Sequence, residues 1–153
     1  MSSINKQTQS LNQQTQSLSK RDAYFRKKEC KGEICVVLDS SFDNRGLRLI
    51  APASLALLKG EIHELIVTDE PAAKPGSIVN RIAYWGFFEV TEASVIVVDD
   101  EITVGDKGVG RIVGFDDTHM PNHLNIVIRT DKRHTGAKID LDVGDIVRIT
   151  KKS

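Results

Sequence analysis

Short apolar segments separated by turn residues dominate the sequence from Gly32 onward. Val, Ile and Thr are frequent in these segments, and glycine recurs between them with aspartate nearby, as in 105–108 and 142–145. Such a composition is typical of β-strands that are joined by tight turns. Because strands do not alternate with long helical segments, a parallel sheet with crossover helices is not expected. The sequence therefore predicts a mostly β domain of eight or nine short strands.

The clearest strand signal is the alternation in 124–129, where apolar side chains at every second position face one side of a sheet. The segment 78–90 contains four aromatic residues close together, Tyr84, Trp85, Phe87 and Phe88. The strands are expected at 34–38, 47–50, 62–67, 95–98, 102–104, 109–115, 124–129, 139–141 and 146–149. Short strands at this spacing favour a small closed or partly open β-barrel, because closure protects exposed sheet edges.

One short helix is expected between 51 and 60. Pro52 suits the first turn of a helix, and Gly60 suits its C-terminal end. Leu55, Leu57 and Leu58 are expected to face the core from this helix.

The N-terminal segment 1–31 differs from the body at 32–153, which is expected to form a single domain. The motif QTQSL occurs at 7–11 and again at 14–18, which gives a seven-residue period with one apolar residue per heptad. A coiled coil uses two apolar positions per heptad. The sequence therefore predicts a disordered tail or a marginal helix, and an ordered helix would require a partner such as a second copy of the chain.

Charge and hydropathy exclude several classes of function. The chain has 21 basic and 21 acidic residues, so nucleic acid is not the expected main partner. The apolar runs are far shorter than the roughly 18 residues that a membrane-spanning helix needs. No apolar signal-peptide core follows Met1, so membrane insertion is not expected and the predicted location is cytoplasmic.

Three stretches of the body resemble the IIA component of the glucitol/sorbitol phosphotransferase system, a small bacterial β-barrel. They are RLIAPASLALLKGEIHELIVTDEPA (48–72), GDKGVGRIVGFDDTHMPNHLNIVIR (105–129) and DVGDIVRI (142–149). The resemblance implies a barrel and a role in carbohydrate uptake or metabolism. It also implies phosphate carriage on a histidine, but the corresponding segment 81–90 contains no histidine, so that step has no nucleophilic nitrogen here.

The densest group of polar residues lies in 114–125, between two expected strands, where binding groups often occur. Carboxylate, amide and imidazole side chains there suit the hydroxyl groups of a sugar, and Trp85 or Tyr84 could stack on an apolar sugar face. The predicted ligand-binding residues are Asp116, Asp117, His119, Asn122, His123, Asn125 and Trp85. The same polar residues could instead only cap turns and satisfy backbone groups.

A divalent metal ion is a second hypothesis for this segment. Its predicted ligands are His119, His123 and Asp117, with Asp116 or His63 completing the coordination shell. Pro121 between the two histidines argues against a helix, so their spacing does not by itself define a metal site. His63 shares its strand face with Leu65 and Val67, which favours a buried, hydrogen-bonded role.

Three functions remain open from the sequence. The first is a non-catalytic module that binds a sugar, polyol or sugar phosphate. The second is a small metal-assisted isomerase or hydrolase that acts on a sugar acid and uses the 116–125 segment. The third is a structural protein that assembles into a homo-oligomer through its tail.

Overall fold

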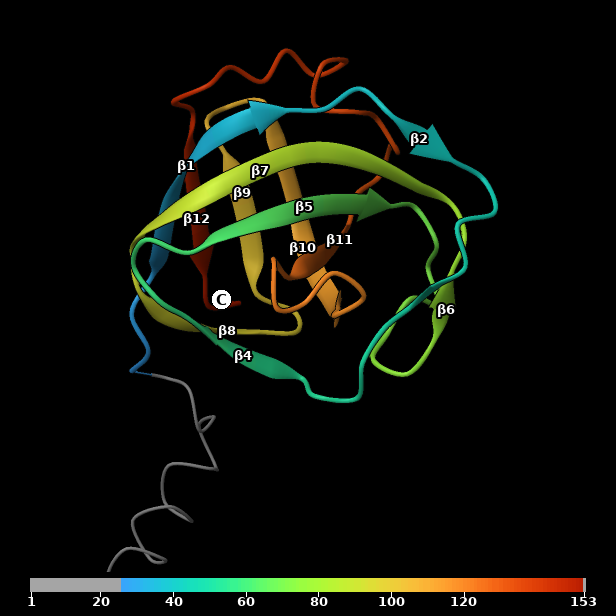
Figure 1. Ribbon diagram of the computed structural model, residues 1–153, viewed down its shortest axis with the longest axis horizontal. Helices are drawn as coiled ribbons and strands as arrows, with labels where there is room; N and C mark the ends of the chain where they lie inside the picture. The colour runs from blue at the N-terminus through green and yellow to red at the C-terminus, as the bar shows by residue number, and fades with distance from the viewer. Residues whose placement is uncertain (1–25, 153) are drawn as a thin grey trace, which may run out of the picture.

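The computed structural model describes residues 26–152, which fold mostly as β-sheet (Figure 1). Most of the tail 1–31, for which disorder or a marginal helix is predicted, lies outside these residues; its last two residues, Cys30 and Lys31, begin a strand. Within them the strands are β1 (Cys30–Val37), β2 (Ser41–Phe42), β3 (Leu47–Arg48), β4 (Ser54–Leu57), β5 (Ile62–Thr68), β6 (Ile78–Val79), β7 (Ile82–Glu92), β8 (Ser94–Val97), β9 (Glu101–Val104), β10 (Gly108–Asp116), β11 (Asn125–Arg129) and β12 (Ile146–Thr150).

Seven of the described strands form a closed ring. They are hydrogen-bonded in the order β1, β12, β9, β10, β11, β5 and β7, and β7 pairs back with β1. The β11–β5 pair is parallel, and the other pairs of the ring are antiparallel. In Figure 1, β7 and β5 cross the front of the molecule while β9 and β10 pass behind them at a steep angle. Because the ring is closed, each of its strands is hydrogen-bonded to a neighbouring strand on both sides.

The close approach of β1 and β7 depends on Gly86. Its φ is +153°, and a Cβ atom added there would overlap the carbonyl oxygen of Val36. A residue with a side chain cannot occupy this position without moving β1, so the glycine permits the last pairing of the ring.

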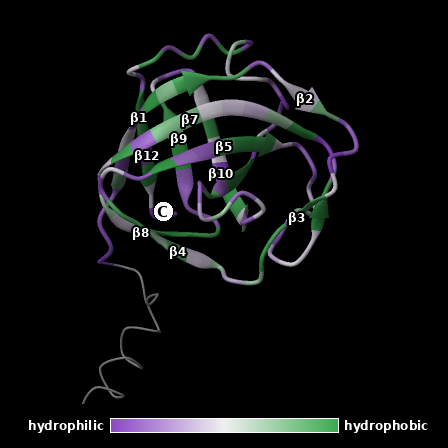
Figure 2. Ribbon diagram, viewed as in Figure 1, coloured by the Kyte–Doolittle hydropathy of each residue, from purple (hydrophilic) through white to green (hydrophobic). Residues whose placement is uncertain are grey.

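Side chains that alternate along the strands form two apolar clusters on opposite faces of the sheet. Leu65, Val67, Ile126 and Ile128 belong to the larger cluster, whereas Ile66 and Val127 belong to the smaller one. The predicted alternation of 124–129 is therefore confirmed. Figure 2 shows that β5 is hydrophilic over its first half and hydrophobic over its second half.

The predicted helix at 51–60 is wrong, and no helix occurs between residues 26 and 152. Ser54–Leu57 is instead a strand that pairs antiparallel with Ser94–Val97 of β8. Leu57 is buried, but Leu58 is exposed, as strand alternation rather than a helical face requires. A segment this short gains little from helical hydrogen bonds, whereas β8 supplies partners for its backbone.

The expected strand at 139–141 is also wrong. This segment forms turns in which Asp140 has a φ of +60° and the Leu141 amide donates to the Gly136 carbonyl oxygen. Leu141 is nevertheless buried in the larger apolar cluster. Leu141 is therefore apolar because its side chain is buried, and not because it belongs to a β-strand.

A helix of the length and apolarity that would cross a membrane is absent from the described part of the chain.

Candidate ligand-binding site

Three polar residues lie next to one another on neighbouring strands at one end of the sheet. Asn125, at the start of β11, is the register partner of Glu64 in β5 and of Asp116 in β10. All three are at least 93% buried, with Glu64 the most exposed at 7%. Register partners place their side chains on the same face of a sheet, so these three form one polar group beside the smaller apolar cluster.

Asp116 holds the orientation of its neighbours through hydrogen bonds. Its Oδ2 atom accepts from Nδ2 of Asn125 at 2.8 Å, and its Oδ1 atom accepts from the Thr118 hydroxyl at 2.7 Å. Because a carboxylate only accepts, the amide nitrogen of Asn125 must face Asp116. The Oδ1 atom of Asn125 therefore points elsewhere, and it is buried with no hydrogen-bond partner among the described residues.

The 117–124 loop brings two histidines over this group. The imidazole rings of His119 and His123 stack with their centroids 5.1 Å apart, and the Phe87 ring contacts His123 edge-on at 5.0 Å. The Nε2 atom of His123 is buried, lies 3.8 Å from Oε1 of Glu64, and has no hydrogen-bond partner within residues 26–152. Two buried polar atoms near Glu64 are thus left without partners, although such atoms are nearly always satisfied in folded proteins.

Burial sets the protonation of both groups. It raises the pKa of Glu64 to about 7, and nearby Asp116 adds to this, while the positive charge of Arg45 opposes it. Burial also lowers the pKa of His123, and the charges of His119 and His63 act in the same direction. At neutral pH the carboxyl of Glu64 is therefore close to half protonated, and His123 is neutral.

A cavity of about 290 Å³ opens onto Glu64 and the two histidines. Its lining residues are Leu38, Ser40, Phe42, Glu64, Tyr84, His119 and His123. The rings of Phe42 and Tyr84 meet edge-to-face, with centroids 6.0 Å apart, and Nε of Arg45 donates to the Tyr84 hydroxyl at 3.4 Å. Aromatic walls beside a few convergent polar groups are typical of sites for small polar molecules.

A second cavity adjoins the first at His123. It has a volume of about 390 Å³ and is lined by Gly60, Ile62, Phe87, Asn122 and His123. His123 therefore lies between two open spaces, which leaves its ring accessible to a molecule on either side.

His63 stays buried and hydrogen-bonded, as its strand face predicts. The backbone N–H of Leu124 donates to its Nδ1 atom at 3.0 Å, so its proton lies on Nε2, which is 3.2 Å from Oε1 of Glu61. These bonds tie the start of β5 to the end of the 117–124 loop, and they give His63 a structural role.

The structure brings together most of the residues that the sequence singled out, and it leaves two outside. Asp116 and Asn125 form the buried base of the site, His119 and His123 line the first cavity, and Asn122 lines the adjoining one. Asp117 is exposed on the loop.

Trp85 does not reach this site. It is 2% exposed, belongs to the larger apolar cluster, and borders a different cavity beside Lys107 and His134. Tyr84, the other aromatic residue considered for stacking, lines the first cavity instead. Adjacent residues of a strand face opposite sides, so only one of the two could lie here.

Within residues 26–152, no group of three or more His, Cys, Asp or Glu side chains is arranged to hold a metal ion. His119 and His123 are adjacent, but Asp117 does not complete such a group with them. The set of His119, His123 and Asp117 stays a prediction.

The sequence reasoning missed Glu64, Arg45 and Phe42. Glu64 carries a detectable signal, because it is a charged residue inside an apolar strand (HELIV) and a buried carboxyl in that position needs a reason. Arg45 and Phe42 lie in an irregular segment and carry no such signal.

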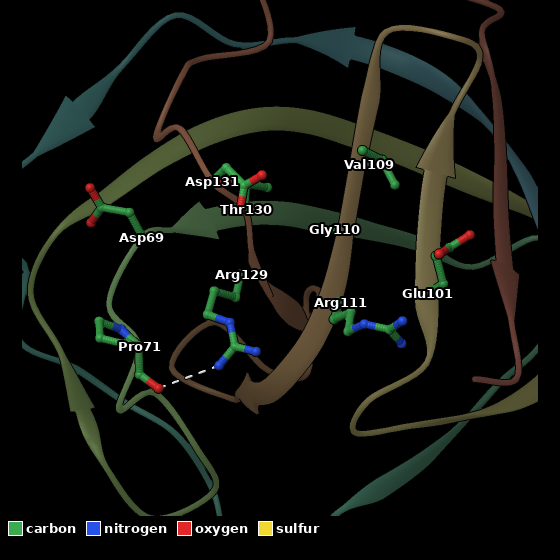
Figure 3. A pocket seen from close by; sticks show the side chains of 9 residues that line it. All are labelled: Asp69, Pro71, Glu101, Val109, Gly110, Arg111, Arg129, Thr130 and Asp131. Atoms are coloured by element: carbon green, nitrogen blue, oxygen red, sulfur yellow. Dashed lines mark hydrogen bonds between the residues drawn. The ribbon is translucent and has the colours of Figure 1, made fainter. Parts of the chain in front are cut away.

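A larger cavity, of about 480 Å³, lies elsewhere on the sheet (Figure 3). It is bordered by Arg111 and Arg129, which are register partners on β10 and β11, and by three carboxylates. Nη1 of Arg129 donates to the Pro71 carbonyl oxygen at 3.3 Å, and Asp69 is bound by Arg81. Among the described residues, no buried polar atom without a hydrogen-bond partner borders this larger cavity. The cavity at Glu64 is therefore the stronger candidate site.

Comparisons with known proteins indicate a family but no activity. No curated protein and no solved structure matches the chain. A family described as "Family of unknown function (DUF6917)" matches residues 24–150, which is most of the sequence. The chain therefore belongs to the DUF6917 family.

Proposed function

We propose that this protein binds a small polyhydroxylated molecule, a sugar, polyol or sugar phosphate, in the cavity at Glu64 and His123. The observation that carries the proposal is the pair of buried polar atoms without partners, His123 Nε2 and Asn125 Oδ1, beside the carboxyl of Glu64. A ligand hydroxyl both donates and accepts hydrogen bonds, so hydroxyl groups in the cavity can pair with the Glu64 carboxyl and the His123 imidazole, which both line it.

The walls of the cavity support the same ligand class. Tyr84 and Phe42 offer aromatic surface for the C–H face of a sugar ring, and Ser40 adds a hydroxyl at the rim. Volumes of about 290 and 390 Å³ for the two adjoining cavities suit a molecule of roughly monosaccharide size.

The resemblance to the glucitol/sorbitol IIA component agrees with this ligand class. We include in the proposal that the ring is a small β-barrel of that kind and that the protein acts in the cytoplasm on carbohydrate uptake or metabolism. Phosphate carriage is not part of the proposal, because 81–90 contains no histidine.

A binding experiment tests the proposal. Sorbitol, D-fructose and D-fructose 6-phosphate are titrated separately into ¹⁵N-labelled protein, and amide chemical shifts are recorded. We expect saturable shifts at Tyr84, His123 and Asn125 for at least one of the three compounds. Their absence for all three compounds would contradict the proposal.

A matched pair of variants locates the binding. His123→Phe keeps a ring against Phe87 but removes the nitrogen that faces Glu64, so we expect about tenfold weaker binding, the equivalent of roughly one hydrogen bond. His134→Phe makes the same chemical change at a residue that borders a different cavity, and it should leave the affinity unchanged.

A further inference from the structure

The arrangement of Glu64 and His123 suits a proton transfer as well as binding. Both side chains line the same cavity, and their nearest polar atoms, Oε1 and Nε2, are 3.8 Å apart. The Nε2 atom of His123 is buried and has no hydrogen-bond partner within residues 26–152. One small molecule in this cavity can therefore contact both side chains at the same time.

We propose that Glu64 and His123 act as a base and a hydrogen-bond donor that isomerise an α-hydroxy aldehyde or ketone of the sugar class. This inference rests on the proposed function, because the substrate would occupy the same cavity. It assigns to the pair a chemistry beyond binding, and it names the substrate class as a carbonyl compound with a hydroxyl on the neighbouring carbon.

The roles follow from the surroundings of each residue. A buried carboxyl whose pKa lies near neutrality can take up and release a proton in the same catalytic cycle. A neutral imidazole with its proton on Nε2 can donate a hydrogen bond to a carbonyl oxygen as negative charge develops there. Phe87 and the stacked His119 hold the His123 ring in place.

The reaction balances without a co-reactant. The Glu64 carboxylate takes the proton from the hydroxyl-bearing carbon, the C–H electron pair forms a C=C bond, and the carbonyl oxygen receives a proton from His123 Nε2. The resulting enediol then gives its other hydroxyl proton to His123, while the Glu64 carboxylic acid returns its proton to the former carbonyl carbon. The product is the isomeric hydroxy-carbonyl compound, with no net change in oxidation state.

Deuterium exchange tests the proposal without knowledge of the natural substrate. D-fructose, D-fructose 6-phosphate and D-glucuronate are each incubated with the full chain in D₂O, and the proton next to the carbonyl group is followed by ¹H NMR. We expect its signal to disappear faster with protein than without for at least one compound. Glu64→Gln should slow this exchange by about 10²-fold or more, because an amide cannot accept the proton.

Controls separate the role in catalysis from a role in folding. Glu89→Gln changes an exposed glutamate of β7 in the same way and should exchange at the wild-type rate. Glu64→Asp keeps a carboxylate and should retain part of the exchange, which a purely structural role would not predict. Thermal unfolding of each variant confirms that it is folded.

The outcomes distinguish the two proposals. Saturable binding of any compound in the titration, with no exchange in D-fructose, D-fructose 6-phosphate or D-glucuronate, would overturn the isomerase inference and leave the binding function standing. Exchange that is equally fast in Glu64→Gln would overturn the assignment of the base. No binding and no exchange would overturn both proposals.

Discussion

The Nε2 atom of His123 lies 3.8 Å from the Oε1 atom of Glu64, inside a site where both side chains are largely buried. The two residues are 59 positions apart in the sequence. They meet because β5 and β11 are parallel neighbours in the ring and because the 117–124 loop turns back over the start of β11. Several measurable properties follow from this arrangement and from the contacts that support it.

The first prediction concerns the pH dependence contributed by Glu64. Its pKa is about 7 in the folded protein against an ordinary 4.5, so the folded state binds the proton more tightly. Its contribution to stability is therefore present below pH 4.5 and is lost as the pH rises through 7. Glu64→Gln should be the more stable protein at pH 8, by up to about 3 kcal/mol, and should lose this advantage at pH 4.5.

Urea unfolding of wild type and Glu64→Gln at pH 4.5, 6 and 8 measures this difference, with Glu89→Gln as the control. The other charged groups around Glu64, which include Arg45, Asp116 and His123, are the same in both proteins. If the difference in unfolding free energy between the two proteins does not change with pH, the pKa of Glu64 is ordinary.

The second prediction concerns the ionisation of His123. Its lowered pKa means that the unfolded chain takes up a proton more readily, so the contribution of His123 to stability is lost as the pH falls below 6.5. An NMR titration of its Cε1 proton should give a midpoint below 6.5. In His119→Gln the midpoint should rise, because one of the positive charges that oppose protonation is removed. An unchanged midpoint would mean that the charge of His119 does not contribute to the lowered pKa of His123.

The third prediction concerns Asp116 as a support of the site. Asp116→Ala leaves the buried amide nitrogen of Asn125 and the Thr118 hydroxyl without their acceptor. We expect the free energy of unfolding to fall by about 1–3 kcal/mol. Asp117→Ala, at the exposed neighbouring position, should change it by less than about 0.5 kcal/mol. Equal effects of the two substitutions on chemical denaturation would contradict the role given to Asp116.

The fourth prediction concerns the closure of the ring. In Gly86→Ala the new Cβ atom meets the Val36 carbonyl oxygen, so β1 must move away from β7. The loss of stability should exceed about 3 kcal/mol. Gly60→Ala also places a side chain at positive φ, here +92°, but in open space, so it should cost only about 1–2 kcal/mol. Thermal unfolding ranks the two, and the reverse order would contradict the close approach.

Local patterns predicted much of the fold because they depend on neighbouring residues alone. Leu124, Ile126 and Ile128 alternate with Asn125, Val127 and Arg129, which predicts that the first three side chains share one buried face, and the structure has it. The expected helix at 51–60 failed because Pro52 and Gly60 mark the ends of a segment without specifying its hydrogen bonds. Those bonds come from β8, about 40 residues away in the sequence.

The candidate site was predicted only in part for the same reason. The 114–125 segment stood out because its polar residues are contiguous, and Asp116, His119, His123 and Asn125 do lie together. Glu64 and Tyr84 reach the site from strands that are distant in the sequence, so only strand order and register could place them there.

The sequence by itself determined a chain rich in short strands, the buried face of each clear strand, and a loop with the composition of a binding segment. Those properties follow from the two-residue repeat of a strand and from the preferences of turn residues, which act over a few positions. Only the tertiary structure decided that the strands close into a ring, that Glu64 faces His123, and that Trp85 faces away. Each of these depends on which strands pair with one another across long distances in the sequence. Because backbone hydrogen bonds are chemically alike in every strand, the sequence carries little information about these pairings.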